Sequence, residues 1–188
     1  MICILPILET RHIDYRICID FLFTICETLI NNNIGIASVM TISLISLKNE
    51  YTAEFKRDIQ EAFQYGFESE FGKCDETILP EKDIDNSLNS EGAEAYLVLD
   101  NGIPCGGVAI RIDADRKHGH LDLLYVKVGH QNSGIGCTIW TSIEKMHPEI
   151  EVWETCTPYF DKRNIHFYVN RCGFRIVEFF NEHHRDPN

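Results

Sequence analysis

Apolar residues along the chain follow two alternating periods, and these periods predict the secondary structure. Segments in which apolar residues recur every three or four positions predict helices at 51–67, 135–146 and 160–171. Apolar runs bounded by turn residues predict strands at 41–47, 93–99, 106–112, 120–126, 150–155 and 174–180. A further short helix is expected after Pro80, because proline is favoured in a first turn. This order of elements is typical of a mixed sheet flanked by helices.

The first 39 residues differ from the rest of the chain. Their longest apolar run, Ile17–Ile30, contains two acidic residues and is too short to span a bilayer. Glu9 and the lack of an early basic cluster argue against a signal peptide. We therefore divide the chain into an extension, 1–39, and a domain, 40–188. The extension is an added helix, a partner contact or translated sequence upstream of a start at Met40, and we favour the last interpretation.

Composition narrows the class of protein. The net charge of −12 argues against a nucleic-acid partner, which would need clustered basic residues. The eight cysteines include no C-x-x-C pair, so neither a zinc site nor a disulfide framework is predicted, and a reducing cytoplasm is the expected compartment. His118, His120, His183 and His184 lack a third ligand at a fixed spacing, so we expect no metal.

One stretch, residues 124–140, carries a recognisable chemical signal. A β-prone run leads into a polar loop with two glycines, and a helical pattern follows. Free backbone N–H groups at the start of such a helix attract anions, phosphates above all. A P-loop would need Gly-Lys-Ser/Thr here, but Cys137 and Thr138 follow Gly136. A dinucleotide-binding loop would need a third glycine where Ile139 stands.

Two motifs in register resemble one family. Gln131-Asn132-Ser133-Gly134-Ile135-Gly136 matches the Gln/Arg-x-x-Gly-x-Gly/Ala signature of the GNAT superfamily, the acetyl-coenzyme A-dependent N-acetyltransferases. The segment 164–174 resembles the later motif of that superfamily, a helix that carries Phe-Tyr and ends in Gly-Phe. The resemblance covers roughly residues 40–180. It implies an α/β (α+β) fold, the GNAT fold, with a mixed and mostly antiparallel sheet of six to seven strands flanked by helices.

The resemblance also implies where acetyl-coenzyme A binds as co-substrate. The backbone amides of the loop would hold its pyrophosphate, and the pantetheine arm would pair with a strand edge that splays away from strand 150–155. One freed N–H on that edge would polarise the thioester carbonyl. The family has an Asn seven residues before its Tyr, and here Asp161 stands there, with Asn164 as the alternative contact. The implied contact residues are Leu124, Tyr125, Val126, Gln131, Asn132, Ser133, Gly134, Ile135, Gly136, Asp161 and Asn164.

Acetyl transfer to an amine needs a general acid and a general base. The resemblance nominates Tyr168 as the acid that protonates the coenzyme thiolate, and a core tyrosine is the plain alternative. His120 and Asp122 share a strand face and are the candidates for the base, with Glu154 on the neighbouring strand as a third. The alternative for this pair is a solvent-facing position, or an ion pair of the aspartate with a nearby Lys or Arg.

The acceptor is less constrained than the donor. Glu68, Glu70, Asp75 and Glu76 lie where the acceptor site is expected and would favour a cationic primary amine, such as a polyamine, an aminoglycoside or a peptide N-terminus. We expect no nucleic-acid or membrane partner, and a homodimer is left open. The alternative from another functional class is a non-catalytic acyl-coenzyme A-binding sensor or scaffold.

Overall fold

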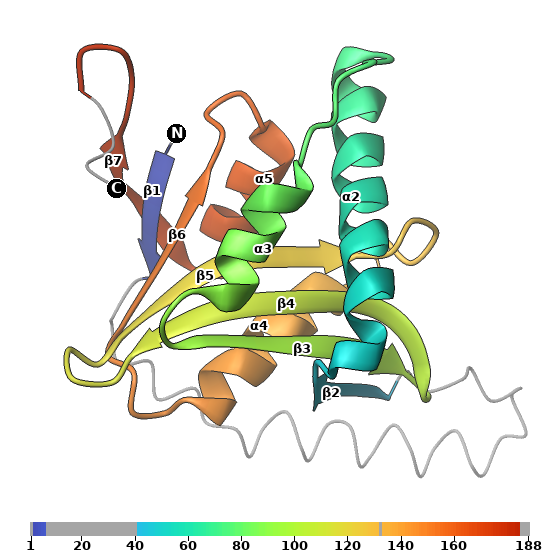
Figure 1. Cartoon of the computed structure of the whole chain (residues 1–188). Coiled ribbons are helices and arrows are strands. Elements are labelled where there is room, and N and C mark those ends of the chain that lie inside the picture. Colours follow the sequence, from blue (N-terminus) through green and yellow to red (C-terminus); the bar gives the residue numbers. More distant parts are fainter. Residues whose placement is uncertain (1, 7–40, 132, 185–188) are drawn as a thin grey trace, which may run out of the picture.

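A computed structural model describes residues 2–6, 41–131 and 133–184 of the chain, and its centre is a sheet (Figure 1). The strands are β1 (Ile2–Pro6), β2 (Ile42–Ser46), β3 (Ala93–Asp100), β4 (Ile103–Asp113), β5 (His118–Val126), β6 (Val152–Thr157) and β7 (Phe174–Phe179). The helices are α2 (Asn49–Phe71), α3 (Glu81–Asn89), α4 (Ile135–Met146), α5 (Lys162–His166) and a π-helical turn, η1 (Phe167–Arg171). Among these residues the seven strands lie in the order β2-β3-β4-β5-β6-β1-β7.

Strands β2 to β5 form an antiparallel meander, and β6 then pairs with β5 in the parallel sense. The predicted turn between β3 and β4 is present, with positive φ at Asn101 (50°) and Gly102 (84°), as a tight hairpin requires. The sheet is thus mixed and mostly antiparallel, as predicted. No helix in the described ranges is both long enough and apolar enough to cross a membrane.

Helices cover both faces of the sheet and bury two separate apolar clusters. α2 and α3 lie on one face, and α4 lies on the other (Figure 1). Phe55, Ile59 and Ile84 are fully buried under the first pair of helices. On the opposite face Trp140 of α4 stacks edge-on against Trp153 of β6 with ring centroids 5.3 Å apart. The predicted helix 51–67 is present and is longer at both ends, since α2 begins at Asn49 and ends at Phe71.

The described part of the N-terminal extension belongs to the sheet. β1 runs antiparallel to β6 on one side and to β7 on the other, so it separates these two strands. The apolar pattern at the start of the chain did not lead to this prediction, because the strand's partners lie about 150 residues further along the sequence. The predicted domain start at Met40 lies outside the described residues and stays a prediction.

The last predicted helix is present but irregular. Asp161 caps α5, since its Oδ1 accepts a hydrogen bond of 2.9 Å from the Asn164 N–H. The helix then widens into the π-helical turn η1, and Gly173 follows it with φ of 79°, the left-handed conformation predicted for that position. A π-helical turn holds one residue more than an α-helical one, so it rotates the side chains that follow it.

Candidate active site

The site begins where β5 and β6 part. Their parallel pairing ends at Leu121 and Thr155. The pairing of β5 with β4 shifts register at the same point: Leu121 and Leu123 oppose consecutive residues of β4, so Asp122 is the extra residue of a β-bulge. A bulge bends the strand that contains it and increases its twist. The bulge at Asp122 therefore gives a physical reason for the splay that the family resemblance implied.

A cavity of about 660 Å³ opens from this splay. Leu124, Tyr125 and Val126 line it; they pair with β4 on one side, and within the described ranges they have no strand partner on the other. Their free edge can therefore bond an extended ligand. Gln131, Ser133, Gly134, Ile135 and Gly136 also line the cavity, as do Asp161 and Asn164. Asn132 lies outside the described residues.

The glycine loop is braced by its own hydrogen bonds. The His130 N–H donates to the Lys127 carbonyl at 3.0 Å, and the Ser133 hydroxyl donates to the His130 carbonyl at 2.6 Å. Gly134 is the N-cap of α4 and has φ of 82°, a conformation that glycine adopts without steric cost. As a glycine it has no side chain to accept from the first-turn N–H groups of α4. This helix end therefore has no side-chain cap at Gly134, and anion binding there stays a prediction.

Gly136 also lies against an aromatic ring, which the sequence did not reveal. A Cβ at this position would lie 3.0 Å from Cε2 and 3.1 Å from Cζ of Phe167. The glycine therefore lets α4 pack closely against η1.

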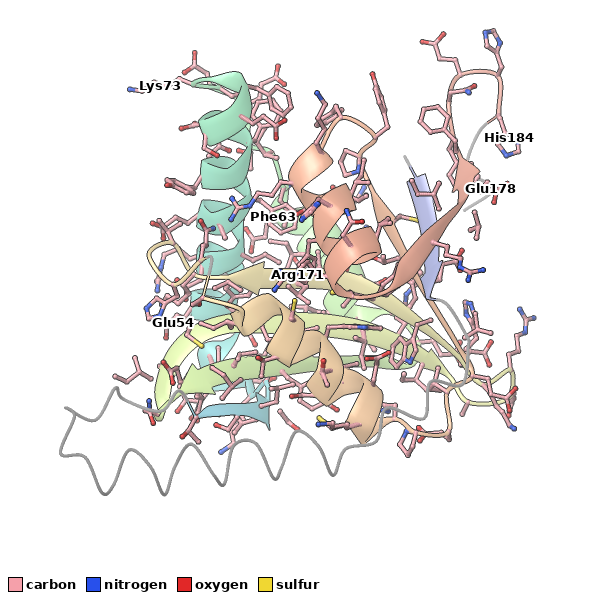
Figure 2. The ribbon with its side chains drawn as sticks, turned by 180° about the vertical axis from the view of Figure 1, so that it is seen from behind. Glu54, Phe63, Lys73, Arg171, Glu178 and His184 are labelled. Atoms are coloured by element: carbon pink, nitrogen blue, oxygen red, sulfur yellow. The ribbon has the colours of Figure 1, made fainter. Side chains whose placement is uncertain are left out.

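Basic side chains surround the same end of the cavity. Arg163, His166 and Arg171 come from α5 and η1, and His130 comes from the loop; all four line the cavity. Figure 2 shows Arg171 near the N-terminal end of α4. These residues were not predicted from the sequence, although the spacings of three and five residues between 163, 166 and 171 could have indicated a basic stretch of the last helix. Arginine side chains of this kind can hold phosphate groups through charge-assisted hydrogen bonds.

Tyr168 is buried and is not among the residues that line the cavity. Its ring packs against Phe174 with centroids 5.7 Å apart, and its hydroxyl is hydrogen-bonded to the side chain of Thr155. Because Thr155 is the last β6 residue paired with β5, the hydroxyl lies at the point where the two strands part. Burial raises the pKa of Tyr168 above its usual value, so the hydroxyl keeps its proton.

His120 and Asp122 are in contact, as predicted from their spacing. The His120 Nδ1 is hydrogen-bonded to Oδ1 of Asp122, and the Asp122 carboxylate also accepts from Nε of Arg111 at 3.0 and 3.2 Å. Burial alone would lower the pKa of His120, but hydrogen bonds to Asp122 and Cys156 outweigh it and raise this pKa to about 9. His120 is therefore an imidazolium at pH 7, held in an ion-paired cluster.

None of the three candidates for the base lines the cavity. His120 and Asp122 precede its first β5 residue, Leu124, by four and two positions. Glu154 lies on β6 with its Oε2 3.5 Å from Nε2 of His118. Within the described residues no three metal-ligating side chains converge on one point.

The opposite end of the cavity is aromatic. α2 contributes Phe63, Phe67 and Phe71, and Phe160 faces them from the loop between β6 and α5. Of the four acidic residues predicted to select a cationic acceptor, Glu70 lines the cavity. Glu68 instead accepts a hydrogen bond of 2.8 Å from Gln64 on its own helix.

Comparison with known proteins agrees with this geometry. Residues 52–174 match the acetyltransferase (GNAT) family. YrkN of Bacillus subtilis (strain 168), an uncharacterized protein, is 46% identical over 136 residues, which are 72% of this chain and 74% of that protein. The mixed sheet with helices on both faces is the GNAT fold. The chain belongs to the acetyltransferase (GNAT) family, which confirms the resemblance and indicates acyl transfer from acetyl-coenzyme A.

Solved structures share the fold at low sequence identity. The PaiA N-acetyltransferase of Thermoplasma acidophilum, in complex with coenzyme A, is 18% identical with a TM-score of 0.60, over 76% of this chain and 94% of that chain. An aminoglycoside acetyltransferase from an uncultured soil metagenomic sample is 17% identical with a TM-score of 0.51, over 74% and 95% of the two chains.

Proposed function

We propose that this protein transfers an acetyl group from acetyl-coenzyme A to a primary amine by direct attack, without a covalent enzyme intermediate. The observation that carries the proposal is the shared cavity. It joins a free strand edge, an uncapped helix N-terminus and a basic helix face to a second, aromatic compartment. The first three features suit a donor with a phosphorylated end and an extended arm, and the last leaves room for an acceptor.

The described residues fit coenzyme A in charge and in shape. The loop Gln131–Gly136 and the cations Arg163 and Arg171 would hold phosphate groups through charge-assisted hydrogen bonds. The free edge of Leu124–Val126 would pair with the amide groups of the pantetheine arm. Acetyl-coenzyme A would supply the activated acetyl group. The residues of this chain would polarise its carbonyl group and transfer the protons.

In the reaction, the amine nitrogen bonds to the acetyl carbon and the carbon–sulfur bond breaks. A backbone N–H of Leu124–Val126 would donate to the carbonyl oxygen while negative charge develops on it. The Tyr168 hydroxyl, at the point where β5 and β6 part, would give its proton to the departing thiolate. The surplus proton of the amine would pass through water to the pair His120–Asp122, because this pair lies outside the cavity lining.

The raised pKa of His120 sets the pH dependence of this mechanism. At pH 7 the ring already holds a proton, so His120 accepts another group's proton only after releasing its own. We therefore expect the rate to rise with pH up to about 9. We also expect the protein to act in the cytoplasm, where its cysteines stay reduced; the five in the described part of the domain are free thiols.

One observation favours a second candidate function. Since the three candidates for the base lie outside the cavity lining, the cavity could bind acyl-coenzyme A without turnover, as a sensor or scaffold would. The two functions differ in whether an amine releases free thiol from acetyl-coenzyme A.

The test measures coenzyme binding by calorimetry and thiol release with a panel of primary amines. Gly134→Asp should abolish binding, because a carboxylate would meet the phosphates, whereas Gly129→Asp should not. Gly129 is a matched control: it has φ of 91° in the same loop and does not line the cavity. Tyr168→Phe should lower kcat by about 10²–10⁴ with unchanged coenzyme affinity, and Tyr65→Phe on the exposed side of α2 should change neither. Binding without thiol release for any amine would establish the sensor.

A further inference from the structure

The acceptor end of the cavity is a cluster of three phenylalanine rings. Phe67 and Phe71 of α2 lie with centroids 4.9 Å apart. Phe160 meets both rings edge-on, at 6.4 Å from Phe67 and 5.6 Å from Phe71, with interplanar angles of 86°. Two segments distant in the sequence thus build one aromatic wall. Figure 2 shows Phe63 on the side of α2 that faces α5, where it continues this wall toward the sheet.

Two of these rings are exposed to solvent. Phe71 is 49% exposed and Phe160 is 41% exposed, although both line a cavity. Exposed aromatic surface that gathers in a concave site marks a binding surface for apolar groups. Ile78, from the loop between α2 and α3, adds a further apolar contact to the same wall.

The charged residues near this wall are few and of both signs: Glu70 on α2, and Asp161 and Arg163 just after Phe160. Glu70 is the one carboxylate of the predicted acidic set that lines the cavity, and Asp75 and Glu76 do not. A polyamine or an aminoglycoside carries several ammonium groups, each of which needs a carboxylate or water as partner. Among the described residues, Glu70 and Asp161 are the carboxylates that line the cavity, and Arg163 beside Asp161 adds a positive charge, so a molecule with several ammonium groups would find few partners among at least four apolar side chains.

On the basis of the acetyl-transfer function proposed above, we infer that the acceptor is a primary amine that carries an aromatic ring. Its ring would lie against Phe71 and Phe160 in the edge-to-face or offset geometry that aromatic groups prefer. Its amine would then extend toward Leu124–Val126, where the thioester is placed. The single ammonium group needs no more charge than Glu70 and the developing reaction centre provide.

The test measures amine binding and turnover separately. The full-length protein saturated with coenzyme A is titrated calorimetrically with 2-phenylethylamine, ethylamine, spermidine and kanamycin, and thiol release from acetyl-coenzyme A is followed in parallel. We expect 2-phenylethylamine to bind at least about tenfold more tightly than the other three amines. Phe71→Ala and Phe160→Ala should each weaken it about three- to tenfold, the range of one aromatic contact, and leave spermidine and coenzyme A affinities unchanged.

Tyr65→Ala is the matched control, because Tyr65 is an exposed aromatic residue on the same helix that does not line the cavity. Tighter binding of spermidine or kanamycin, no binding of any amine, or equal effects of Tyr65→Ala and Phe71→Ala would each overturn the inference. Selective binding of 2-phenylethylamine without thiol release would support the ligand class and refute acetyl transfer, so the two proposals fail separately.

Discussion

Lys127 joins the glycine loop to α2 through a buried carboxylate, and replacing it by methionine tests that anchor. Its Nζ lies 2.9 Å from Oδ2 of Asp58 and 3.8 Å from Oε1 of Glu54. The Asp58 side chain is 4% exposed, so it depends on neighbouring charges for compensation. Its other cationic neighbour, Arg57, is 3.7 Å away and 69% exposed, which makes it a weak substitute.

Removing one partner of a buried ion pair costs about 3–5 kcal/mol, because the remaining charge is left uncompensated. Since Arg57 retains part of the compensation, we expect the lower end, about 3 kcal/mol, for Lys127→Met. For a chain of this length that corresponds to a fall in Tm of about 6–12 °C. In a double-mutant cycle with Asp58→Asn, the two substitutions should show a coupling of about 2 kcal/mol or more.

Thermal unfolding followed by circular dichroism measures this effect. The control is Lys117→Met, which breaks the exposed pair Lys117–Glu151 and should barely move Tm, since surface ion pairs contribute little. If Lys127→Met lowers Tm no more than Lys117→Met does, the Asp58 carboxylate is not a buried charge that needs Lys127, and the reasoning is refuted.

Three further substitutions test the charges around the site. His120→Gln removes a group whose pKa is about 9 in the folded protein and 6.5 ordinarily. Protonated His120 therefore stabilises the fold fully below pH 6.5, and this stabilisation is lost as the pH rises to 9. In urea titrations the free energy of unfolding of the wild type should fall by about 3 kcal/mol relative to this variant over that range. The same variant should remove the rise in rate toward pH 9. Arg171→Ala should weaken coenzyme A about tenfold and reduce the salt dependence of binding, as calorimetry at two ionic strengths would show. Asp161→Asn keeps the helix cap and removes an anion from the cavity, so Tm should hold while coenzyme A binds more tightly; weaker binding would refute this.

That the glycine loop and the strand before it line one cavity was predictable, because they are local in the sequence. The loop Gln131–Gly136 and the strand before it are contiguous, so strand, turn and helix signals fix their relative geometry. Asp161 and Asn164 follow from one helix motif and reach the same cavity. Such short-range patterns carry both the structure and the chemistry.

The rest of the site depends on contacts between distant segments. The state of His120 could not be deduced from its spacing to Asp122, because Arg111 of β4 and Cys156 of β6 act on the same cluster. The charges of Glu68, Asp75 and Glu76 suggested a cationic acceptor, but these residues do not line the cavity. Glu70 and a set of aromatic rings line it instead. Nothing local to α2 shows that Phe71 will meet Phe160.

Gly136 shows how a correct prediction can rest on an incomplete reason. The motif explains this glycine by the close approach of a phosphate, while the structure adds the ring of Phe167 at 3.0 Å from the position of a Cβ. The two reasons predict different results for Gly136→Ala. If packing decides, an overpacked contact costs about 1–3 kcal/mol, which exceeds the roughly 0.5–1 kcal/mol that alanine gains over glycine in a helix, so the variant loses stability. Phe167→Leu in the same chain then restores it by removing the ring edge. If phosphate approach decides, Gly136→Ala weakens coenzyme A binding with Tm unchanged, and Phe167→Leu rescues nothing. We expect the first result, since the ring is within contact distance of the site of the new methyl group whether or not coenzyme is bound; unfolding and calorimetry on the three variants discriminate between them.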